Sequence, residues 1–286
     1  MSITCELNLN NQNETFEFEK VAKQANGSVL YTVNNTVILA SVASEFDNPV
    51  SEDFTPLTVQ YIEKTYANAK INGGFIKREG KQSDFETLTS RIIDRSLRPL
   101  FPSGYVYPTT ITVMVLSVDH DADLQVMALN AASAALYYSN LPITKSVAAV
   151  RIGQINGNLV VNPSLKEQDD SSLDLFIAGT LDELLMIEMK TTASEDMVEA
   201  DIESFVKVHN TNEMNEDDLL EAIALASSSI KEVSSTYEKA FKEISKEIVD
   251  VELKEFKIDE AVISYVKDTF YDDIRAAVSK LAKSER

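Results

Sequence analysis

Cysteine, histidine and tryptophan are almost missing from this chain of 286 residues, which has one cysteine, two histidines and no tryptophan. The single cysteine, Cys5, cannot form an intrachain disulfide, which is typical of a protein from the reducing cytoplasm. His120 and His209 stand alone, without an HExxH or paired Cys/His pattern. We therefore expect a cytoplasmic protein with no metal site in this chain.

Long apolar runs and basic residues are also scarce. No stretch approaches the roughly 18 apolar residues of a membrane helix, so no membrane partner is expected. The chain has 26 Lys and Arg against 46 Asp and Glu, which gives a formal net charge of -20. This charge argues against nonspecific coating of nucleic acid. It leaves room for one local binding surface, because salt screens the acidic field within about 8 Å.

The hydrophobic pattern of the first 211 residues predicts a mixed α+β fold, because strands and helices do not alternate regularly. Asn34-Asn35 is expected to close a hairpin, and Ser83 and Glu86 have the spacing of a helix capping box. We expect residues 109–118 to form a strand buried on both faces. The predicted strands are residues 15–19, 28–32, 36–42, 57–62, 109–118, 146–155, 159–161, 173–177 and 184–189, and the predicted helices are 84–100, 124–138 and 194–208.

The chain after residue 211 has a different character. It contains 18 acidic and 11 basic residues and no good strand. Residues 216–249 and 257–283 have the periodicity of two long amphipathic helices. The sequence therefore predicts two units, a core over residues 1–211 and a small all-helical domain over residues 212–286.

One basic segment stands out against the acidic background. Eight Lys and Arg but only four acids lie between Lys64 and Arg98. Such a reversal of charge suggests a dedicated surface for an anionic partner.

Two parts of this segment suit nucleic acid in different ways. The loop with Phe75, Lys77, Arg78 and Lys81 combines an aromatic ring with cations, as single-stranded RNA or DNA requires. The helix that follows carries Arg91, Arg95 and Arg98 at spacings of four and three, so the three guanidinium groups share one face and could bind phosphate. The alternative is that Asp84, Glu86 and Asp94 hold these arginines in structural ion pairs.

Several separate motifs, in order, resemble the bacterial polynucleotide phosphorylase family (polyribonucleotide nucleotidyltransferase). The residues that carry the resemblance are DFTPLTVQYIEKTYANAKINGGFIKREGKQSDFETLTSRIIDRSLRPLFPSGY, LNAASAALYYSNLPI, AAVRIGQING and LDLFIAGT. The resemblance implies an RNase PH-like fold (ribosomal protein S5 domain 2-like), a mixed sheet with packed helices followed by a small all-α domain. This chain would be the first core and the helical domain of that family.

The resemblance also implies an activity. Members degrade RNA from the 3′ end, with inorganic phosphate as co-substrate and Mg²⁺ as cofactor, and release nucleoside diphosphates. They form homotrimeric rings in which RNA passes the loop that here reads Phe75-Ile76-Lys77-Arg78. Single-stranded RNA and further copies of the chain are the implied partners, and proteins of RNA-degradation complexes are left open.

Two departures from the family bear on the chemistry. The family's catalytic carboxylates belong to a second core, and their places correspond here to Lys166 and Ser172, neither of which is an anionic ligand for Mg²⁺. Asp169, Asp170 and Asp174 lie nearby in the sequence. We therefore expect no catalytic residue in this portion and a first core that is catalytically silent.

The second core and the KH and S1 modules of the family are not in the sequence, so we expect a fragment that supplies a ring scaffold and an RNA channel. Two alternatives remain open. The chain could be a noncatalytic RNA-binding or assembly subunit of an exosome-like ring, or the arginine helix could bind phosphate itself, with Arg91 as the first candidate.

Overall fold

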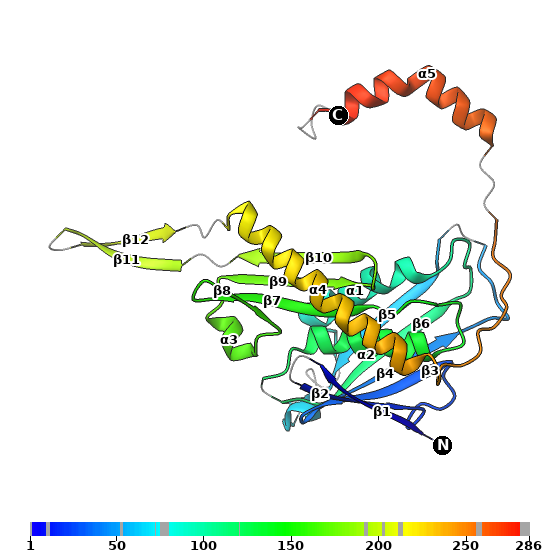
Figure 1. Ribbon diagram of the computed structural model, residues 1–286, viewed down its shortest axis with the longest axis horizontal. Helices are drawn as coiled ribbons and strands as arrows, with labels where there is room; N and C mark the ends of the chain where they lie inside the picture. The colour runs from blue at the N-terminus through cyan, green and yellow to red at the C-terminus, as the bar shows by residue number, and fades with distance from the viewer. Residues whose placement is uncertain are drawn as a thin grey trace.

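The computed structural model describes residues 2–9, 12–51, 54–71, 73–74, 80–119, 121–191, 194–201, 204–210, 214–255 and 259–280. Two sheets and the helices that pack on them form the body of the molecule, as Figure 1 shows. The α+β class predicted from the sequence is confirmed.

The larger sheet has six strands in the order β1-β2-β3-β4-β6-β5. All neighbouring strands are antiparallel except β5 and β6, which are parallel. The predicted hairpin is present, and Asn34 in its turn has a positive φ of 52°, which asparagine tolerates better than most residues. The strands are β1 Ile3–Leu9, β2 Gln12–Phe18, β3 Gly27–Val33, β4 Thr36–Ser44, β5 Leu57–Glu63 and β6 Thr109–Ser117.

The second sheet is antiparallel and has four strands in the order β10-β9-β7-β8. The predicted hairpin between β7 and β8 is present, with Gly157 at a φ of 79° in its turn. A short helix, α3 (Leu165–Asp169), follows this hairpin. The strands are β7 Ala148–Ile155, β8 Asn158–Val161, β9 Leu173–Gly179 and β10 Leu184–Thr191.

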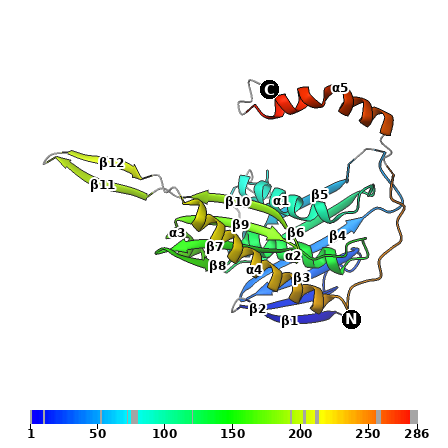
Figure 2. The ribbon, with the colours of Figure 1, turned by 45° about the horizontal axis from the view of Figure 1, so that its top comes forward.

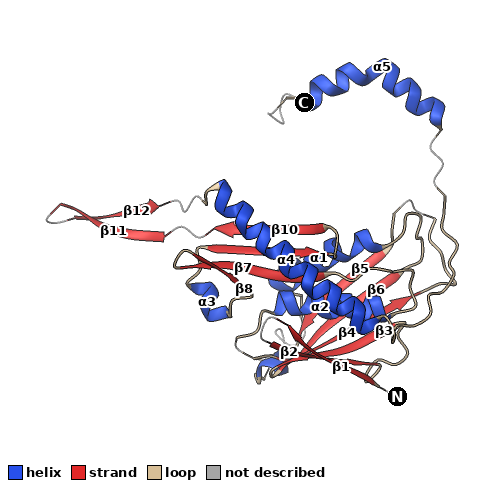
Figure 3. Ribbon diagram, in the orientation of Figure 1, coloured by secondary structure: helices blue, strands red, loops and turns tan. Residues whose placement is uncertain are grey.

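One predicted helix is wrong. Residues 194–208 belong instead to β11 (Ser194–Asp201) and β12 (Ser204–Asn210), which form a separate two-stranded antiparallel ribbon beyond β10 (Figure 3). The β-branched residues Val198, Val206 and Val208 favour extended backbone, and pairing between the two halves satisfies the backbone groups that a helix would satisfy internally.

Helix α2 (Leu124–Tyr138) joins the two sheets, since it contacts β3 and β4 of the first and β7 of the second. Its small residues allow this close approach. A Cβ atom at Gly27 of β3 would lie only 2.2 Å from the carbonyl oxygen of Ala135, so this position excludes any larger residue.

Strand β6 was expected to be buried on both faces, but it is fully buried on only one. Thr109, Ile111, Val113 and Val115 are buried, whereas the residues between them are only half-buried. The reason is that α2 covers one face of this sheet near β6.

Helix α4 (Glu216–Phe241) packs on β7, β9 and α2, although it lies beyond the predicted boundary at residue 212. Tyr237 and Phe241 near its end meet Phe16 and Phe18 of β2 in edge-to-face contacts, with ring centroids 5.1–5.3 Å apart. The helix ends eight residues before the predicted limit, because Lys246 and Val249 donate backbone hydrogen bonds to Tyr138 and Asn140 instead. The division into two domains stays a prediction.

Helix α5 (Glu260–Val278) has no buried residue and lies apart from the two sheets in Figures 1 and 2. Tyr265, Tyr271 and Val278 on this helix are more than half exposed. In the part of the chain that the structure describes, no helix is both long enough and apolar enough to cross a membrane.

Candidate nucleic-acid interface

The loop expected to bind RNA falls largely outside the described residues. Phe75, Lys77 and Arg78 lie in the undescribed segment 75–79. Lys81 is described, and its side chain is exposed two residues before the helix cap at Ser83. The role of these four residues stays a prediction.

The arginine helix is α1 (Asp84–Leu97), which continues into a 3-10 turn at Arg98–Leu100. It begins with the predicted capping box. The amide of Glu86 donates to Ser83 Oγ at 3.1 Å, and the amide of Ser83 donates to Glu86 Oε2 at 2.7 Å. This reciprocal pair satisfies two amides that a helix start leaves without partners.

Helix α1 also covers the free edge of the six-stranded sheet. The amide of Glu63 in β5 donates to Glu86 Oε1 at 2.9 Å, and the amide of Tyr61 donates to Ser90 Oγ at 2.9 Å. Burial tends to raise the pKa of Glu86, but the hydrogen bonds from Glu63 and Ser83 outweigh it and lower the pKa. Side chains of α1 thus replace a neighbouring strand and fix the helix on the sheet edge.

The apolar residues of α1 that pack inward lie in its second half. Ile92, Ile93 and Leu97 are buried, but Phe85 and Leu88 are 44% and 51% exposed. Phe85 only meets the ring of Tyr61 edge-on, with centroids 6.3 Å apart.

The three arginines of α1 have different surroundings. The Arg98 guanidinium donates to both carboxylate oxygens of Asp94 and, at 2.7 and 3.0 Å, to the carbonyl oxygens of Thr55 and Leu57. Arg91 and Arg95 are exposed one turn apart, and within the described residues neither has an ion-pair or hydrogen-bond partner. Arg98 therefore joins α1 to the segment before β5, while Arg91 and Arg95 remain accessible to an anion.

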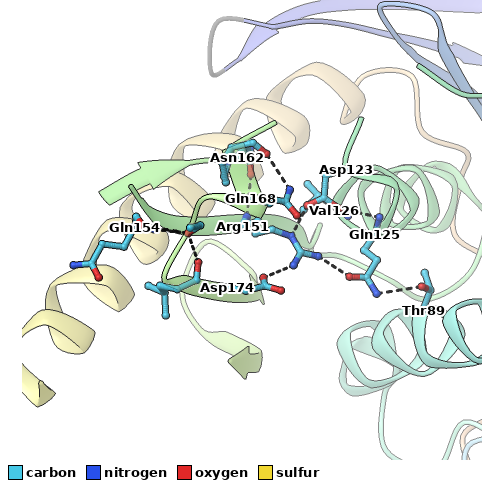
Figure 4. A network of polar contacts seen from close by, with 12 residues as sticks. Thr89, Asp123, Gln125, Val126, Arg151, Gln154, Asn162, Gln168 and Asp174 are labelled. Atoms are coloured by element: carbon cyan, nitrogen blue, oxygen red, sulfur yellow. Dashed lines mark hydrogen bonds and ion pairs between the residues drawn. The ribbon is translucent and has the colours of Figure 1, made fainter. Parts of the chain in front are cut away.

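Behind this helix lies a buried polar centre, shown in Figure 4, that the sequence patterns did not single out. Arg151 of β7 is only 7% exposed. Its Nε donates to Asp123 Oδ2 at 2.5 Å, its Nη2 donates to Gln125 Oε1 at 2.6 Å, and its Nη1 donates to Asp174 Oδ1 of β9. An arginine inside the apolar run AAVRIG was the one signal in the sequence, because a charge in a buried strand requires partners.

The polar centre is connected to α1. The Gln125 amide group donates to the hydroxyl of Thr89 at 3.3 Å, and Thr89 is fully buried in α1. A cavity of about 150 Å³ lies between α1 and β10, and Leu88, Arg151 and Met189 are among its lining residues. The exposed arginines therefore lie on the outer face of α1, and the buried polar centre contacts the inner face of the same helix through Thr89.

The positions that correspond to the family's catalytic carboxylates do not form a metal site. Lys166 is exposed on α3, and the Ser172 hydroxyl bonds Gln154 Oε1 at 3.0 Å. Among the described residues, no three His, Cys, Asp or Glu side chains converge in a way that could hold a metal ion. The residues present therefore do not fit the Mg²⁺ that the resemblance implies.

Two models of the 3′ exoribonuclease family match the chain, domain 1 over residues 11–142 and domain 2 over residues 145–229. The chain belongs to the 3′ exoribonuclease family. The second match extends past residue 212 into α4, in agreement with the packing of this helix on the body.

Curated relatives in this family confirm the resemblance predicted from the motifs. The chain is 67% identical over all 286 residues to a polyribonucleotide nucleotidyltransferase of Aliarcobacter butzleri and 55% identical over 292 aligned positions to that of Wolinella succinogenes. It spans 39% and 40% of the lengths of these two proteins. These relatives favour the polynucleotide phosphorylase interpretation over an exosome-like subunit.

The fold has a solved counterpart in rice. The crystal structure of rice Rrp46 superposes with a TM-score of 0.56 at 16% identity, over 78% of this chain and 92% of that one. At this identity the likeness shows the fold alone, and it confirms the predicted RNase PH-like architecture.

Proposed function

We propose that this chain is the RNA-guiding and scaffold portion of a polyribonucleotide nucleotidyltransferase. In the whole protein, inorganic phosphate attacks the terminal phosphodiester of RNA and releases nucleoside diphosphates from the 3′ end. Mg²⁺ would be held by residues outside this chain and would supply charge stabilisation for the transferring phosphoryl group. The protein acts in the cytoplasm in mRNA degradation, as a homotrimeric ring that threads single-stranded RNA.

The observation that carries this proposal is the 67% identity along the full chain to a polyribonucleotide nucleotidyltransferase. The free guanidinium groups of Arg91 and Arg95 on one face of α1 support an RNA-phosphate surface. The same two groups would also bind inorganic phosphate, with Arg91 as first candidate, whereas Arg98 has its donors engaged by Asp94, Thr55 and Leu57.

The loop of Phe75, Lys77, Arg78 and Lys81 is proposed as the constriction that grips RNA. In the full-length protein, Lys77→Ala/Arg78→Ala should weaken binding of single-stranded RNA and make the salt dependence shallower, by a slope of about 0.7 per lost phosphate contact. Fluorescence anisotropy with labelled oligoadenylate at several salt concentrations measures both quantities. Lys239→Ala/Lys242→Ala removes the same charge from two exposed positions, one in the last turn of α4 and one at its C-cap, and serves as the matched control. Equal affinity and slope in wild type and the loop variant would remove this loop from the RNA path.

The first core is proposed to be catalytically silent. The 286-residue chain alone, supplied with poly(A), inorganic phosphate and Mg²⁺, should release no nucleoside diphosphate, because Lys166 and Ser172 offer no carboxylate for the metal. Chromatography of the nucleotide products checks this, with the full-length protein as the positive control. Steady release of ADP by the isolated chain would contradict the proposal.

A further inference from the structure

Three oxygen atoms from two parts of the fold, the start of α2 and β9, converge on the Arg151 guanidinium. They are Asp123 Oδ2 at the N-cap of α2, Gln125 Oε1 in the first turn of α2, and Asp174 Oδ1 of β9. Figure 4 shows them arranged around the tip of the side chain. The side chains of Arg151 and Asp123 are only 8% and 12% exposed, whereas that of Asp174 is 42% exposed at the rim of the cluster.

The charges in this cluster require a cation at its centre. Two carboxylates face one guanidinium, and Asp123 also accepts the amides of Gln125 and Val126 through Oδ1. Burial opposes the positive charge of Arg151, but Asp123 and Asp174 outweigh it and raise the pKa of the guanidinium. Without the guanidinium, the mostly buried carboxylate of Asp123 and the half-exposed carboxylate of Asp174 would face the same space with no cation between them.

The oxygen atoms are also the type that divalent cations prefer. Mg²⁺ and Mn²⁺ bind carboxylate and amide oxygens, and Mg²⁺ commonly keeps several water ligands and uses one or two carboxylates. Arg151 engages one oxygen of each of these three side chains, so a metal ion and the guanidinium cannot occupy the centre together. The Mg²⁺ that the family implies therefore has no place in this core, and the reason lies in Arg151 as well as in Lys166 and Ser172.

We propose that Arg151 is a built-in cation that takes the place of a divalent metal ion, and that removing its side chain opens a divalent-cation site at Asp123, Gln125 and Asp174. The adjoining cavity of about 150 Å³, which Arg151 and Asp174 help to line, would provide room for the water ligands. The proposal rests on the geometry of this chain alone and holds whether or not the proposed RNA function does.

The test compares Arg151→Ser with wild type in the 286-residue chain. Mn²⁺ binding is followed by electron paramagnetic resonance of the free ion, and thermal unfolding is recorded in EDTA and at increasing MgCl₂. We expect one additional tightly bound Mn²⁺ per chain in Arg151→Ser, and a melting temperature that rises with the MgCl₂ concentration more steeply than in wild type.

Two further variants separate a built site from general attraction to an acidic chain. Lys145→Ser removes one positive charge beside Asp182 at the surface, where Lys145 and Asp182 form an exposed ion pair, and it should bind Mn²⁺ as wild type does. Arg151→Ser/Asp174→Asn removes one of the two carboxylates and should lose the additional ion. Equal Mn²⁺ binding by Arg151→Ser and wild type, or by Arg151→Ser and the double variant, would overturn the proposal.

Arg151→Ser can also fail to fold without metal. Refolding from urea is then compared in EDTA and in millimolar MnCl₂, with circular dichroism as the readout. Recovery of the native spectrum only with Mn²⁺ supports a cation requirement at this centre. No recovery at any Mn²⁺ concentration, while Arg151→Ser/Asp174→Asn folds, would show that a metal ion cannot replace the guanidinium.

Discussion

Arg91 on the outer face of α1 and Arg151 in the polar centre behind it carry the same side chain in opposite environments. Arg91 is exposed and has no partner within the described residues, whereas Arg151 is 7% exposed and bonds two carboxylates and an amide. The comparison teaches that the location of an arginine decides its use. An exposed guanidinium keeps its donors for a ligand, while a buried one must use them inside the fold.

The largest expected effect is on the buried side of this comparison. Arg151→Ala should lower the free energy of unfolding by about 3 kcal/mol, the lower end for a broken buried ion pair, because it leaves the mostly buried Asp123 without a countercharge while water can still reach Asp174, whose side chain is 42% exposed. Arg91→Ala should stay within about 0.5 kcal/mol of wild type, as is usual for an exposed position. Urea unfolding in EDTA measures both values. Similar losses of unfolding free energy in the two variants would contradict the difference drawn between Arg91 and Arg151.

An intermediate effect is expected for the exposed arginines of α1, Arg91 and Arg95. Arg91→Ala/Arg95→Ala should weaken the binding of single-stranded RNA and lower the slope of log affinity against log salt by about 1.4, or about 0.7 for each phosphate contact. Arg98→Ala is the matched control from the same helix, because its guanidinium already bonds Asp94 and two carbonyl groups.

The control should leave the salt slope unchanged while lowering the free energy of unfolding by about 1–2 kcal/mol through its lost hydrogen bonds. Anisotropy titrations and urea unfolding distinguish the two outcomes. A salt slope that falls in Arg98→Ala and not in Arg91→Ala/Arg95→Ala would reverse our division of the three arginines.

The smallest expected effect concerns Glu86, which holds the start of α1 on β5. The folded state lowers its pKa, so its ionised form stabilises the protein above the unfolded-state value near 4.5, and this contribution is lost as the pH falls through the folded-state value. Thermal unfolding of wild type and Glu86→Gln between pH 7 and pH 3 should give curves that converge toward low pH. A gap that widens on acidification would contradict the lowered pKa.

Local patterns predicted most of the fold. The capping spacing of Ser83 and Glu86, the turn at Asn34 and the Ala-rich helix over residues 124–138 each depend on neighbours in the sequence, and the structure has all three. The segment 194–208 was predicted wrongly, because its strands pair only with each other and its acidic residues offer no clear period of two. The prediction that α4 continues over residues 242–249 was also wrong, since backbone hydrogen bonds to Tyr138 and Asn140 replace those that a helix would make there.

The candidate site was predicted only in part. The sequence placed Arg91, Arg95 and Arg98 on one helix, and it suggested the loop around Phe75 from its ring and cations, a role that stays a prediction. It did not identify the polar centre, because Asp123, Arg151 and Asp174 are far apart in the chain and only the packing of α2 against β7, together with the pairing of β7 and β9, brings them together.

The sequence by itself determined the family, the secondary structure over most of the chain and the reversal of charge between Lys64 and Arg98, since these follow from composition, periodicity and motif order. Only the tertiary structure decided which arginines are accessible. Arg98 finds its carbonyl partners at Thr55 and Leu57, 43 and 41 residues earlier in the chain, and Arg151 finds Asp123 and Asp174 on other elements. A charge pattern shows how many cationic side chains a segment has. How many of their N–H donors remain free for a ligand depends on which distant oxygen atoms folding places beside them.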